Sequence, residues 1–229
     1  MRLIQAEVGQ MRNFNYLAGC DSTGEAALVD PAWEVDRMID RAVAEGLTIT
    51  RLLVTHTHPD HIEGLALAWS RTRATIHVHS LEAPAAAARL ETGGAAEGAA
   101  DIREMSDGDG IEIGKLTIRV MHTPGHTPGA VCYLVPGGVV TGDTLFVGRC
   151  GRTDFPGSDP EAMYQSLRRL AALPEDTVVY PGHNYADRPT STIGRERIEN
   201  VHMSAPDRVE FLRRRMGDEY LLRIAGGGR

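Results

Sequence analysis

The sequence predicts an α/β fold of two halves, each a β-sheet covered by helices, that pack sheet to sheet as an αββα sandwich. Short apolar-alternating runs, which are typical of strands, gather at the start of the chain and again from about residue 110. In each half the strands come first and are followed by a helix, a strand and a further helix. At 229 residues the chain can form one domain, because single domains reach roughly 250 residues.

The first half of the chain is expected to form one sheet and its helices. Its expected elements are strands over residues 2–8, 14–19 and 25–30, a helix over 35–44, a strand over 51–55, a helix over about 62–69 and a strand over 74–79. The first three runs are short and close together, which favours an antiparallel meander. The apolar residues of the first helix share one stripe, and Gly46 is of a type that often ends helices.

The second half follows an Ala- and Gly-rich stretch, residues 83–100, which predicts a surface excursion of a helix and a loose loop. Its expected elements are strands over IEIGKLTIRVMH, AVCYLV and GGVVTGD, a helix over roughly 160–172, a strand over 177–180 and helical patterns to the end of the chain. Pro136-Gly137-Gly138 predicts a turn between the last two of the three runs. We expect a single domain over residues 1–229, with a helical C-terminal tail over about 190–229.

The composition argues against several classes of protein. The formal net charge is -7, whereas a nucleic-acid-binding surface needs clustered positive charge, so we expect no nucleic-acid partner. No stretch approaches about 18 apolar residues, and the first residues lack the apolar core of a signal peptide. The three cysteines are odd in number and widely spaced, which favours a reducing compartment over a disulfide framework. We therefore expect a cytoplasmic protein with no membrane partner.

A dense cluster of metal-binding residue types follows the expected strand over 51–55. The segment VTHTHPDHIEG contains the pattern H-x-H-x-D-H, which is formed by His56, His58, Asp60 and His61. A chain that turns after a strand can direct alternate and adjacent side chains to one point. Imidazole nitrogens and carboxylate oxygens suit zinc, iron and manganese. The cluster therefore predicts a metal site rather than a polar surface turn.

Three isolated residues further along the chain have a similar context. His126 lies in HTPGHTPG, Asp143 in VVTGDTLF and His183 in VVYPGHNY, each beside an apolar strand-like run on a turn that contains glycine. Such turns can bring distant ligands to one edge of a sheet. Asp143 is suited to bridge two metals because a carboxylate offers two oxygens and several lone pairs.

The remaining histidines and one cysteine fit a structural role better. His77 and His79 share one face of a strand, and His202 lies in the helical tail. His122 precedes His126 by four residues, so an alternative for it is a supporting hydrogen bond at the site. Cys150 is near the site in sequence, but a lone cysteine flanked by arginines can equally pack in the core.

The order of the seven metal-binding residues resembles the metallo-β-lactamase superfamily over about residues 10–200. The resemblance implies a four-layer αββα sandwich with the metal site at the edge between the sheets. In its binuclear members one metal has three histidine ligands, the second has a mixed set, and an aspartate bridges them. Carried over to this chain, these ligands are His56, His58 and His126, then Asp60, His61 and His183, and finally Asp143.

Longer motifs resemble two branches of this superfamily. TGDTLFVGRCGRTDFPGSDP, VVYPGHNY and STIGRERIEN are similar to the persulfide dioxygenases and to glyoxalase II, which hydrolyses glutathione thioesters. GRTDF is typical of the dioxygenases, and the resemblance implies that Arg152 and Tyr185 bind the glutathione part of the substrate. Glyoxalase II usually has a lysine in place of this arginine and a longer C-terminal helical domain, whereas only about 45 residues follow His183 here. However, the dioxygenases commonly read YPAHDY where this chain has YPGHNY.

The first functional prediction is a persulfide dioxygenase that oxidises glutathione persulfide to sulfite and glutathione at one mononuclear non-haem Fe(II) per chain. The resemblance implies that His56, His126 and Asp143 hold the iron, which leaves open positions for the sulfur substrate and O₂. The other four metal-binding residues would then orient these ligands and hydrogen-bond to bound water or oxygen. Among them, Asp60 and His61 are the catalytic candidates.

The alternative prediction is a glyoxalase II-like hydrolase of glutathione thioesters with a binuclear zinc or zinc–iron site. All seven residues would then be ligands, and a bridging water would attack the thioester carbonyl, its pKa lowered from about 15.7 towards roughly 7. Both predictions give the chain a small-molecule, glutathione-derived partner, and a homodimer is left open. A non-catalytic scaffold that binds a partner is disfavoured, because every ligand-type residue is kept.

Overall fold

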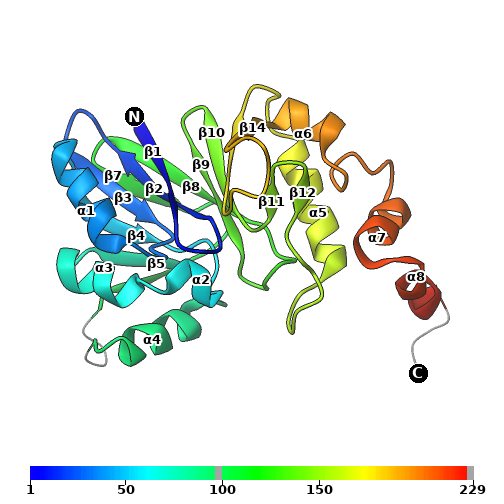
Figure 1. The fold of residues 1–229 in the computed structure, drawn as a ribbon, viewed down its shortest axis with the longest axis horizontal. Helices are drawn as coiled ribbons and strands as arrows, with labels where there is room; N and C mark the ends of the chain where they lie inside the picture. Colours follow the sequence, from blue (N-terminus) through cyan, green and yellow to red (C-terminus); the bar gives the residue numbers. More distant parts are fainter. Residues whose placement is uncertain (96–99, 226–229) are drawn as a thin grey trace.

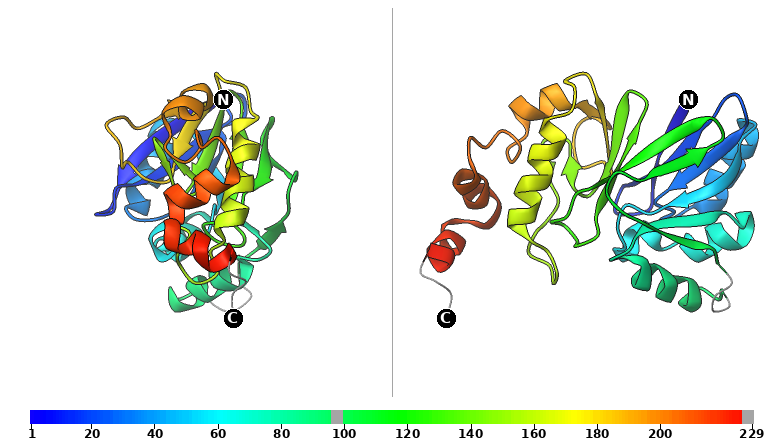
Figure 2. Two further views of the ribbon diagram at one scale, coloured as in Figure 1. Left: turned by 90° about the vertical axis from the view of Figure 1, so that its right-hand side faces the viewer. Right: turned by 180° about the vertical axis from the view of Figure 1, so that it is seen from behind.

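The computed structural model describes residues 1–95 and 100–225, which form an α/β fold of two sheets packed face to face. Helices lie on the outer side of each sheet (Figure 1). The view from behind shows the same order of helix, sheet, sheet and helix (Figure 2, right). The predicted α/β sandwich is therefore confirmed.

The first sheet has six strands in sequence order. They are β1 Arg2–Val8, β2 Asn13–Gly19, β3 Glu25–Val29, β4 Thr48–Leu53, β5 Thr75–His79 and β6 Ile102–Met105. The first three strands pair antiparallel, as the short apolar runs predicted, and each later strand pairs parallel to the one before it. Parallel strands need a crossover, so a helix lies between each of these pairs.

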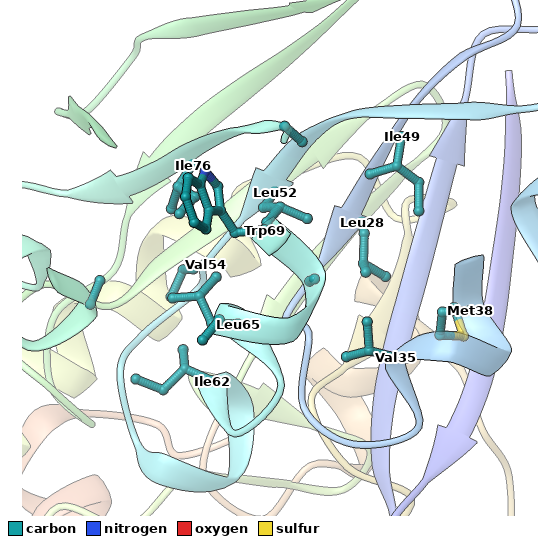
Figure 3. Packing of buried hydrophobic residues seen from close by; sticks show 14 of the residues in the cluster. Leu28, Val35, Met38, Ile49, Leu52, Val54, Ile62, Leu65, Trp69 and Ile76 are labelled. Carbon is teal, nitrogen blue, oxygen red and sulfur yellow. The ribbon is translucent and has the colours of Figure 1, made fainter. Parts of the chain in front are cut away.

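Helices cover the outer face of the first sheet. They are α1 Val35–Ala44, α2 Pro59–Ile62, α3 Leu65–Thr72 and α4 Ala83–Thr92. Helix α1 has the extent that the sequence predicted, because Val35, Met38 and Ala42 recur at helical spacing and are buried. Figure 3 shows residues of α1, α2 and α3 packed on the sheet, with Leu28 and Leu52 in the shared core.

The second sheet has the strand order β14-β13-β10-β9-β8-β7. Its strands are β7 Gly110–Ile113, β8 Leu116–His122, β9 Val131–Val135, β10 Gly138–Gly142, β13 Val178–Pro181 and β14 Ser191–Thr192. Strands β7 to β10 form an antiparallel meander, and β13 pairs parallel to β10. A small separate sheet consists of β11 Leu145–Phe146 and β12 Arg149–Cys150.

The helices of the second half lie on the outer side of this sheet (Figure 2). They are α5 Pro160–Ala171, α6 Ile193–Glu199, α7 Arg208–Met216 and α8 Asp218–Ala225. In α5 the buried residues include Met163, Leu167 and Leu170, which pack in one cluster with Phe211 of α7. The last three helices fall within the tail expected over about 190–229, of which residues 226–229 lie outside the described part of the chain.

The inner faces of the two sheets share a core that also contains hydrogen bonds between the sheets. The hydroxyl of Tyr16, on β2, donates to the carbonyl oxygen of Pro181 at 2.5 Å. The hydroxyl of Tyr133, on β9, donates to the carbonyl oxygen of Val54 at 2.7 Å. Both acceptors lie two residues before a candidate metal ligand, so these bonds join the sheets close to the candidate site.

The structure corrects several of the predicted boundaries. The helix expected over about 62–69 is two helices, α2 and α3, separated where the amide of Gly64 donates to the carbonyl oxygen of Pro31 at 2.9 Å. The strand expected over 51–55 is β4, which ends at Leu53. Strand β6 was not expected, since it lies beyond the Ala- and Gly-rich stretch, of which residues 96–99 are outside the described residues.

Two further observations concern the whole chain. In the described part, no helix combines the length and apolar character needed to cross a membrane. Cys20, Cys132 and Cys150 are buried free thiols.

Candidate metal centre

The candidate ligands lie on loops that follow strands of both sheets. His56 and His58 follow β4, and Asp60 and His61 begin the short helix α2 directly after them. In the second sheet, Asp143 comes immediately after β10. The remaining two histidines lie on the loops after β8 and β13 and are His126 and His183. Because β10 and β13 are parallel neighbours, their carboxyl ends meet at one edge.

The structure brings all seven candidates together. Their ligand atoms form three groups in which every pair of atoms lies within 4.8 Å. The groups are His56, His58 and His126; His56, His61 and Asp143; and Asp60, His61 and His183. Asp143 is central, since its carboxylate oxygens lie 3.2 Å from Nε2 of His61 and 3.5 Å from Nε2 of both His126 and His183.

Close approach at this edge depends on a glycine. Gly182 precedes His183, and a Cβ atom on it would lie 2.4 Å from Oδ1 of Asp143. Contacts that short do not occur between real side chains, so any larger residue would push the two ligand loops apart. The glycine-containing turns noted in the sequence thus have a direct role in bringing these two residues together.

Three buried atoms of the cluster lack a hydrogen-bond partner of good geometry among the described residues: Nε2 of His56, Nε2 of His126 and Oδ1 of Asp143, although the last lies 3.2 Å from Nε2 of His61. Buried polar atoms are nearly always paired in folded proteins, and each exception needs an explanation. The rings of both histidines are held from behind, since Nδ1 of His56 lies 3.1 Å from Oγ1 of Thr55 and Nδ1 of His126 lies 2.8 Å from the carbonyl oxygen of Arg152. Two imidazole nitrogens and a carboxylate oxygen are donor types that suit a metal ion.

The other part of the cluster is hydrogen-bonded within the protein. Nδ1 of His61 lies 3.0 Å from Oδ2 of Asp30, and Nδ1 of His183 lies 2.9 Å from the carbonyl oxygen of Met11. The side-chain amide of Asn13 donates to Oδ2 of Asp60 at 3.0 Å, and this oxygen lies 3.2 Å from Nε2 of His183.

The carboxylates dominate the electrostatics of this part. Burial raises the pKa of Asp60, but hydrogen bonds from His183 and Asn13 and the charge of His61 outweigh burial and lower it to about 2. Burial lowers the pKa of His183, but hydrogen bonds to Asp143 and Asp60 raise it to about 9. For His56 burial prevails and its pKa is well below the ordinary value. The carboxylates of the cluster are therefore ionised with a protonated His183 beside them, and a divalent cation would take the place of that positive charge.

Asp30 is an important residue that the sequence reasoning missed. It is buried at the end of β3 and accepts hydrogen bonds from the backbone amide and the hydroxyl of Thr55, each at 2.7 Å, besides its contact with His61. Its backbone has a positive φ of 47°, which is uncommon for a residue other than glycine. The residue pattern gave no signal for it beyond an aspartate at a strand end.

The two predicted substrate-binding residues line one cavity of about 470 Å³ beside the cluster. The residues around it are Phe146, Gly148, Arg149, Cys150, Arg152, Tyr185, Val201, His202 and Arg215. The ring of Tyr185 stacks on that of His183, with ring centroids 4.5 Å apart. Burial and the nearby aspartates raise the pKa of Tyr185 to about 12, so its hydroxyl stays protonated. The cavity is thus lined by three arginines and adjoins the cluster at Tyr185.

Arg152 forms an exposed ion pair with Asp154. Its guanidinium donates to both carboxylate oxygens of Asp154, at 2.8 and 2.9 Å, and is 61% exposed. It also lies over the ring of Phe155 at 4.2 Å, and this ring packs against those of His58 and His126. Arg152 is therefore near the cluster but not part of it.

The residues given a structural role lie apart from the three ligand groups. The rings of His79 and His122 stack on each other, and Nδ1 of His202 accepts from the amide of Cys150. Burial raises the pKa of the Cys150 thiol to about 12, which makes it unreactive.

Comparison with known proteins agrees with this architecture. Residues 11–183 match the Metallo-beta-lactamase superfamily, and the chain belongs to it. The relatives include a hydroxyacylglutathione hydrolase of Polaromonas, 36% identical over 77% of this chain and 64% of the relative. They also include the human mitochondrial persulfide dioxygenase ETHE1, 33% identical over 83% of this chain and 71% of the relative. The crystal structure of ETHE1 from Myxococcus xanthus superposes with a TM-score of 0.80, at 34% identity over 92% of this chain and 88% of that one. Both an oxygenase and a hydrolase are therefore among its relatives.

Proposed function

We propose that the protein is a persulfide dioxygenase that converts glutathione persulfide, O₂ and water to glutathione and sulfite with one Fe(II) per chain. The observation that supports this proposal is the identity of the three buried atoms that lack a hydrogen-bond partner of good geometry among the described residues. They belong to His56, His126 and Asp143, which is the set of two histidines and one carboxylate that mononuclear iron oxygenases use. An iron ion there would coordinate a sulfur ligand and activate O₂.

In this proposal the other residues of the cluster transfer or hold protons and orient the metal ligands. Asp60 and His61 are the catalytic candidates, since Oδ2 of Asp60 lies 3.5 Å from Nε2 of His61, which in turn lies 3.2 Å from Oδ1 of Asp143. His183 lies against Asp60 and Asp143 and helps to keep both carboxylates ionised. Phe155 packs on two of the histidine rings and shields the cluster from water.

Substrate capture is assigned to the cavity beside the cluster. Glutathione has two carboxylates, and a guanidinium binds a carboxylate through two parallel hydrogen bonds. Arg149, Arg152 and Arg215 line the cavity together with Tyr185, whose ring stacks on that of His183. A glutathione moiety held there would direct its sulfur towards the metal.

A second candidate is a hydrolase of glutathione thioesters with two zinc ions. The observation in its favour is that Asp60, His61 and His183 form a group of their own, compact enough for a second metal. In this case all seven residues would bind metal, and Asp143 would lie between the two ions.

One experiment separates the candidates. The protein is purified without oxygen, its metals are counted, and O₂ uptake with glutathione persulfide is measured beside hydrolysis of a glutathione thioester. The dioxygenase proposal expects one iron per chain, O₂ uptake and sulfite. Two zinc ions per chain, with thioester hydrolysis and no O₂ uptake, would replace it with the hydrolase.

A further inference from the structure

Glu82 is a buried carboxylate close to the metal centre that neither proposed mechanism uses. It lies at the N-terminal end of α4 and is only 5% exposed. Its side chain does not cap this helix. A buried ionised carboxylate is costly unless hydrogen bonds compensate its lost hydration, so its partners indicate its role.

The two oxygens of Glu82 bind two separate loops. Oε2 accepts from the backbone amide of Thr57 at 3.1 Å and from the hydroxyl of the same residue. Oε1 accepts from the hydroxyl of Thr127 at 2.6 Å and from the amide of Gly129 at 3.1 Å. Each oxygen therefore has two donors, and each pair of donors comes from one loop.

These loops carry the three histidines of one ligand group. Thr57 lies between His56 and His58, on the loop after β4 of the first sheet. Thr127 directly follows His126, on the loop after β8 of the second sheet. The three histidines have their ligand nitrogens within 4.8 Å of one another. Glu82 thus joins two loops of opposite sheets at the positions where their ligand nitrogens must meet.

Close packing at Gly129 supports a specific contact. A Cβ atom on Gly129 would lie 2.6 Å from Cγ of Glu82 and 3.1 Å from its Oε1. The absence of a side chain at this position lets the backbone amide reach the carboxylate.

We infer that Glu82 is a positioning residue, which sets the separation of the two loops and thereby the affinity of the His56, His58 and His126 group for metal. The inference rests on the metal site of the proposed function but is independent of which reaction that site catalyses. A carboxylate suits this task because it offers only acceptors, two to each loop. A glutamine would place an N–H group against one of the loops, where the donors of that loop need an acceptor.

The test compares cobalt(II) binding to metal-free wild-type protein, Glu82→Gln and Glu91→Gln. Glu91 is an exposed glutamate on the same helix, so its variant is a matched control. Loss of a group that orients metal ligands typically weakens metal binding by roughly 10- to 100-fold. We expect a loss of this size and an altered visible cobalt spectrum in Glu82→Gln, with neither change in Glu91→Gln. Equal affinity and spectra in all three proteins would overturn the inference.

Two further variants keep the inference testable if Glu82→Gln does not fold. Thr57→Val and Thr127→Val each remove one hydroxyl donor to Glu82, and each should weaken cobalt binding. If Glu82→Gln does fold, Thr57→Val or Thr127→Val added to it should weaken cobalt binding by less than the same substitution does in the wild type. The reason is that all three substitutions act through one carboxylate. Variants that melt earlier without metal but bind cobalt as the wild type does would give Glu82 a purely structural role and contradict the inference. Wild-type protein that binds no cobalt would instead refute the metal site of the proposed function.

Discussion

At the metal centre, each buried ring is held through one nitrogen so that the other faces the cluster. Nδ1 of His126 donates to the carbonyl oxygen of Arg152, and Nδ1 of His183 donates to the carbonyl oxygen of Met11. Such contacts fix the tautomer and the orientation of a metal-binding imidazole. Replacement of a ligand should therefore remove the metal and also cost some stability, because the same buried ring holds a neighbouring loop through its other nitrogen.

The triad residues provide the first test of this expectation. We expect His56→Ala, His126→Ala and Asp143→Asn each to abolish metal binding and activity, whether the enzyme is an oxygenase or a hydrolase. Metal content is measured by elemental analysis and turnover by the assays described above. A variant with near-stoichiometric metal and full turnover would remove that residue from the site.

The remaining ligand-type residues distinguish one metal from two. Nε2 of His61 and Nε2 of His183 already lie within 3.5 Å of carboxylate oxygens, whereas Nε2 of His56 and of His126 have no hydrogen-bond partner among the described residues. We therefore expect His61→Ala and His183→Ala to retain most of the iron. Activity should fall in both variants, since these residues face the reacting centre. Two tightly bound zinc ions that are lost stepwise in these variants would establish a binuclear hydrolase.

Arg152 is expected to act on the substrate and not on the metal. Arg152→Ala should raise KM for the glutathione substrate by roughly 10- to 150-fold, since a hydrogen bond to a charged group contributes about 1.5–3 kcal/mol. Metal content and melting temperature should hardly change, because an exposed ion pair such as that with Asp154 contributes only about 0–1 kcal/mol.

Asp154→Asn is the control for this variant. It removes the ion pair but leaves the guanidinium free to bind a carboxylate, so KM should stay near the wild-type value. If Arg152→Ala instead left KM unchanged and lowered the melting temperature, Arg152 would be structural, and the case for glutathione would lose its main support.

The sequence indicated ligand candidates by residue type and local context, but not the residues that support them. His56, His58, Asp60 and His61 are recognisable because they cluster within a few positions. Asp30 is a single aspartate remote from that cluster in sequence, and its contact with His61 exists only once β3 and β4 lie side by side. Spacing along a chain carries no information about such a contact.

At the scale of elements, helix α5 follows the loops that carry His126 and Asp143 and depends on its N-terminal cap. Oδ1 of Asp159 accepts from the amides of Glu161 and Ala162 at 2.8 and 3.1 Å, and Pro160 occupies the first helical position. Both features stabilise a helix start. The sequence predicted this helix almost at its observed limits, because its cap, proline and apolar stripe all agree.

The cap gives a prediction for stability. Asp159→Ala should lower the free energy of unfolding by about 1 kcal/mol, the usual effect of losing a cap, as measured in urea. Asp159→Asn retains a side-chain oxygen acceptor and should keep most of the stability. Equal losses in the two variants would mean that the negative charge matters and the hydrogen bond does not.

The elements that the sequence missed are short or lie where tertiary contacts decide. Strands β11, β12 and β14 have two residues each, which is too short for a period to be visible. The break between α2 and α3 depends on a hydrogen bond from Gly64 to the distant Pro31. The apolar pattern of the segment that contains α2 and α3 is compatible with one continuous helix.

At the scale of the whole molecule, the site exists because two sheets from different halves of the chain meet. Runs of alternating apolar and polar residues predicted the strands of each sheet. They could not predict which edge of the first sheet lies beside which edge of the second. In the structure the amide of Phe14 donates to the carbonyl oxygen of Gly182 at 2.8 Å, and the hydroxyls of Tyr16 and Tyr133 cross between the sheets. The candidate ligands of both halves therefore depend on one interface.

This interface predicts that residues 1–229 unfold as a single domain. Both tryptophans, Trp33 and Trp69, belong to the first half, so their fluorescence reports that half, whereas far-UV circular dichroism reports the helices of both. If the halves form one cooperative unit, the two signals should change at the same urea concentration. A fluorescence transition well separated from that of circular dichroism would divide the chain into two domains.

A tyrosine substitution makes this test specific to the interface. Tyr133→Phe leaves the buried carbonyl of Val54 without this donor, which should cost about 1–3 kcal/mol. In a single domain both probes should shift by the same amount, although Tyr133 lies in the second half and both tryptophans lie in the first. Tyr220→Phe is the control, because its hydroxyl has no hydrogen bond among the described residues, and it should shift neither probe. A shift confined to circular dichroism in Tyr133→Phe would show that the sheets unfold separately, and the metal centre would then have to form after each half had folded.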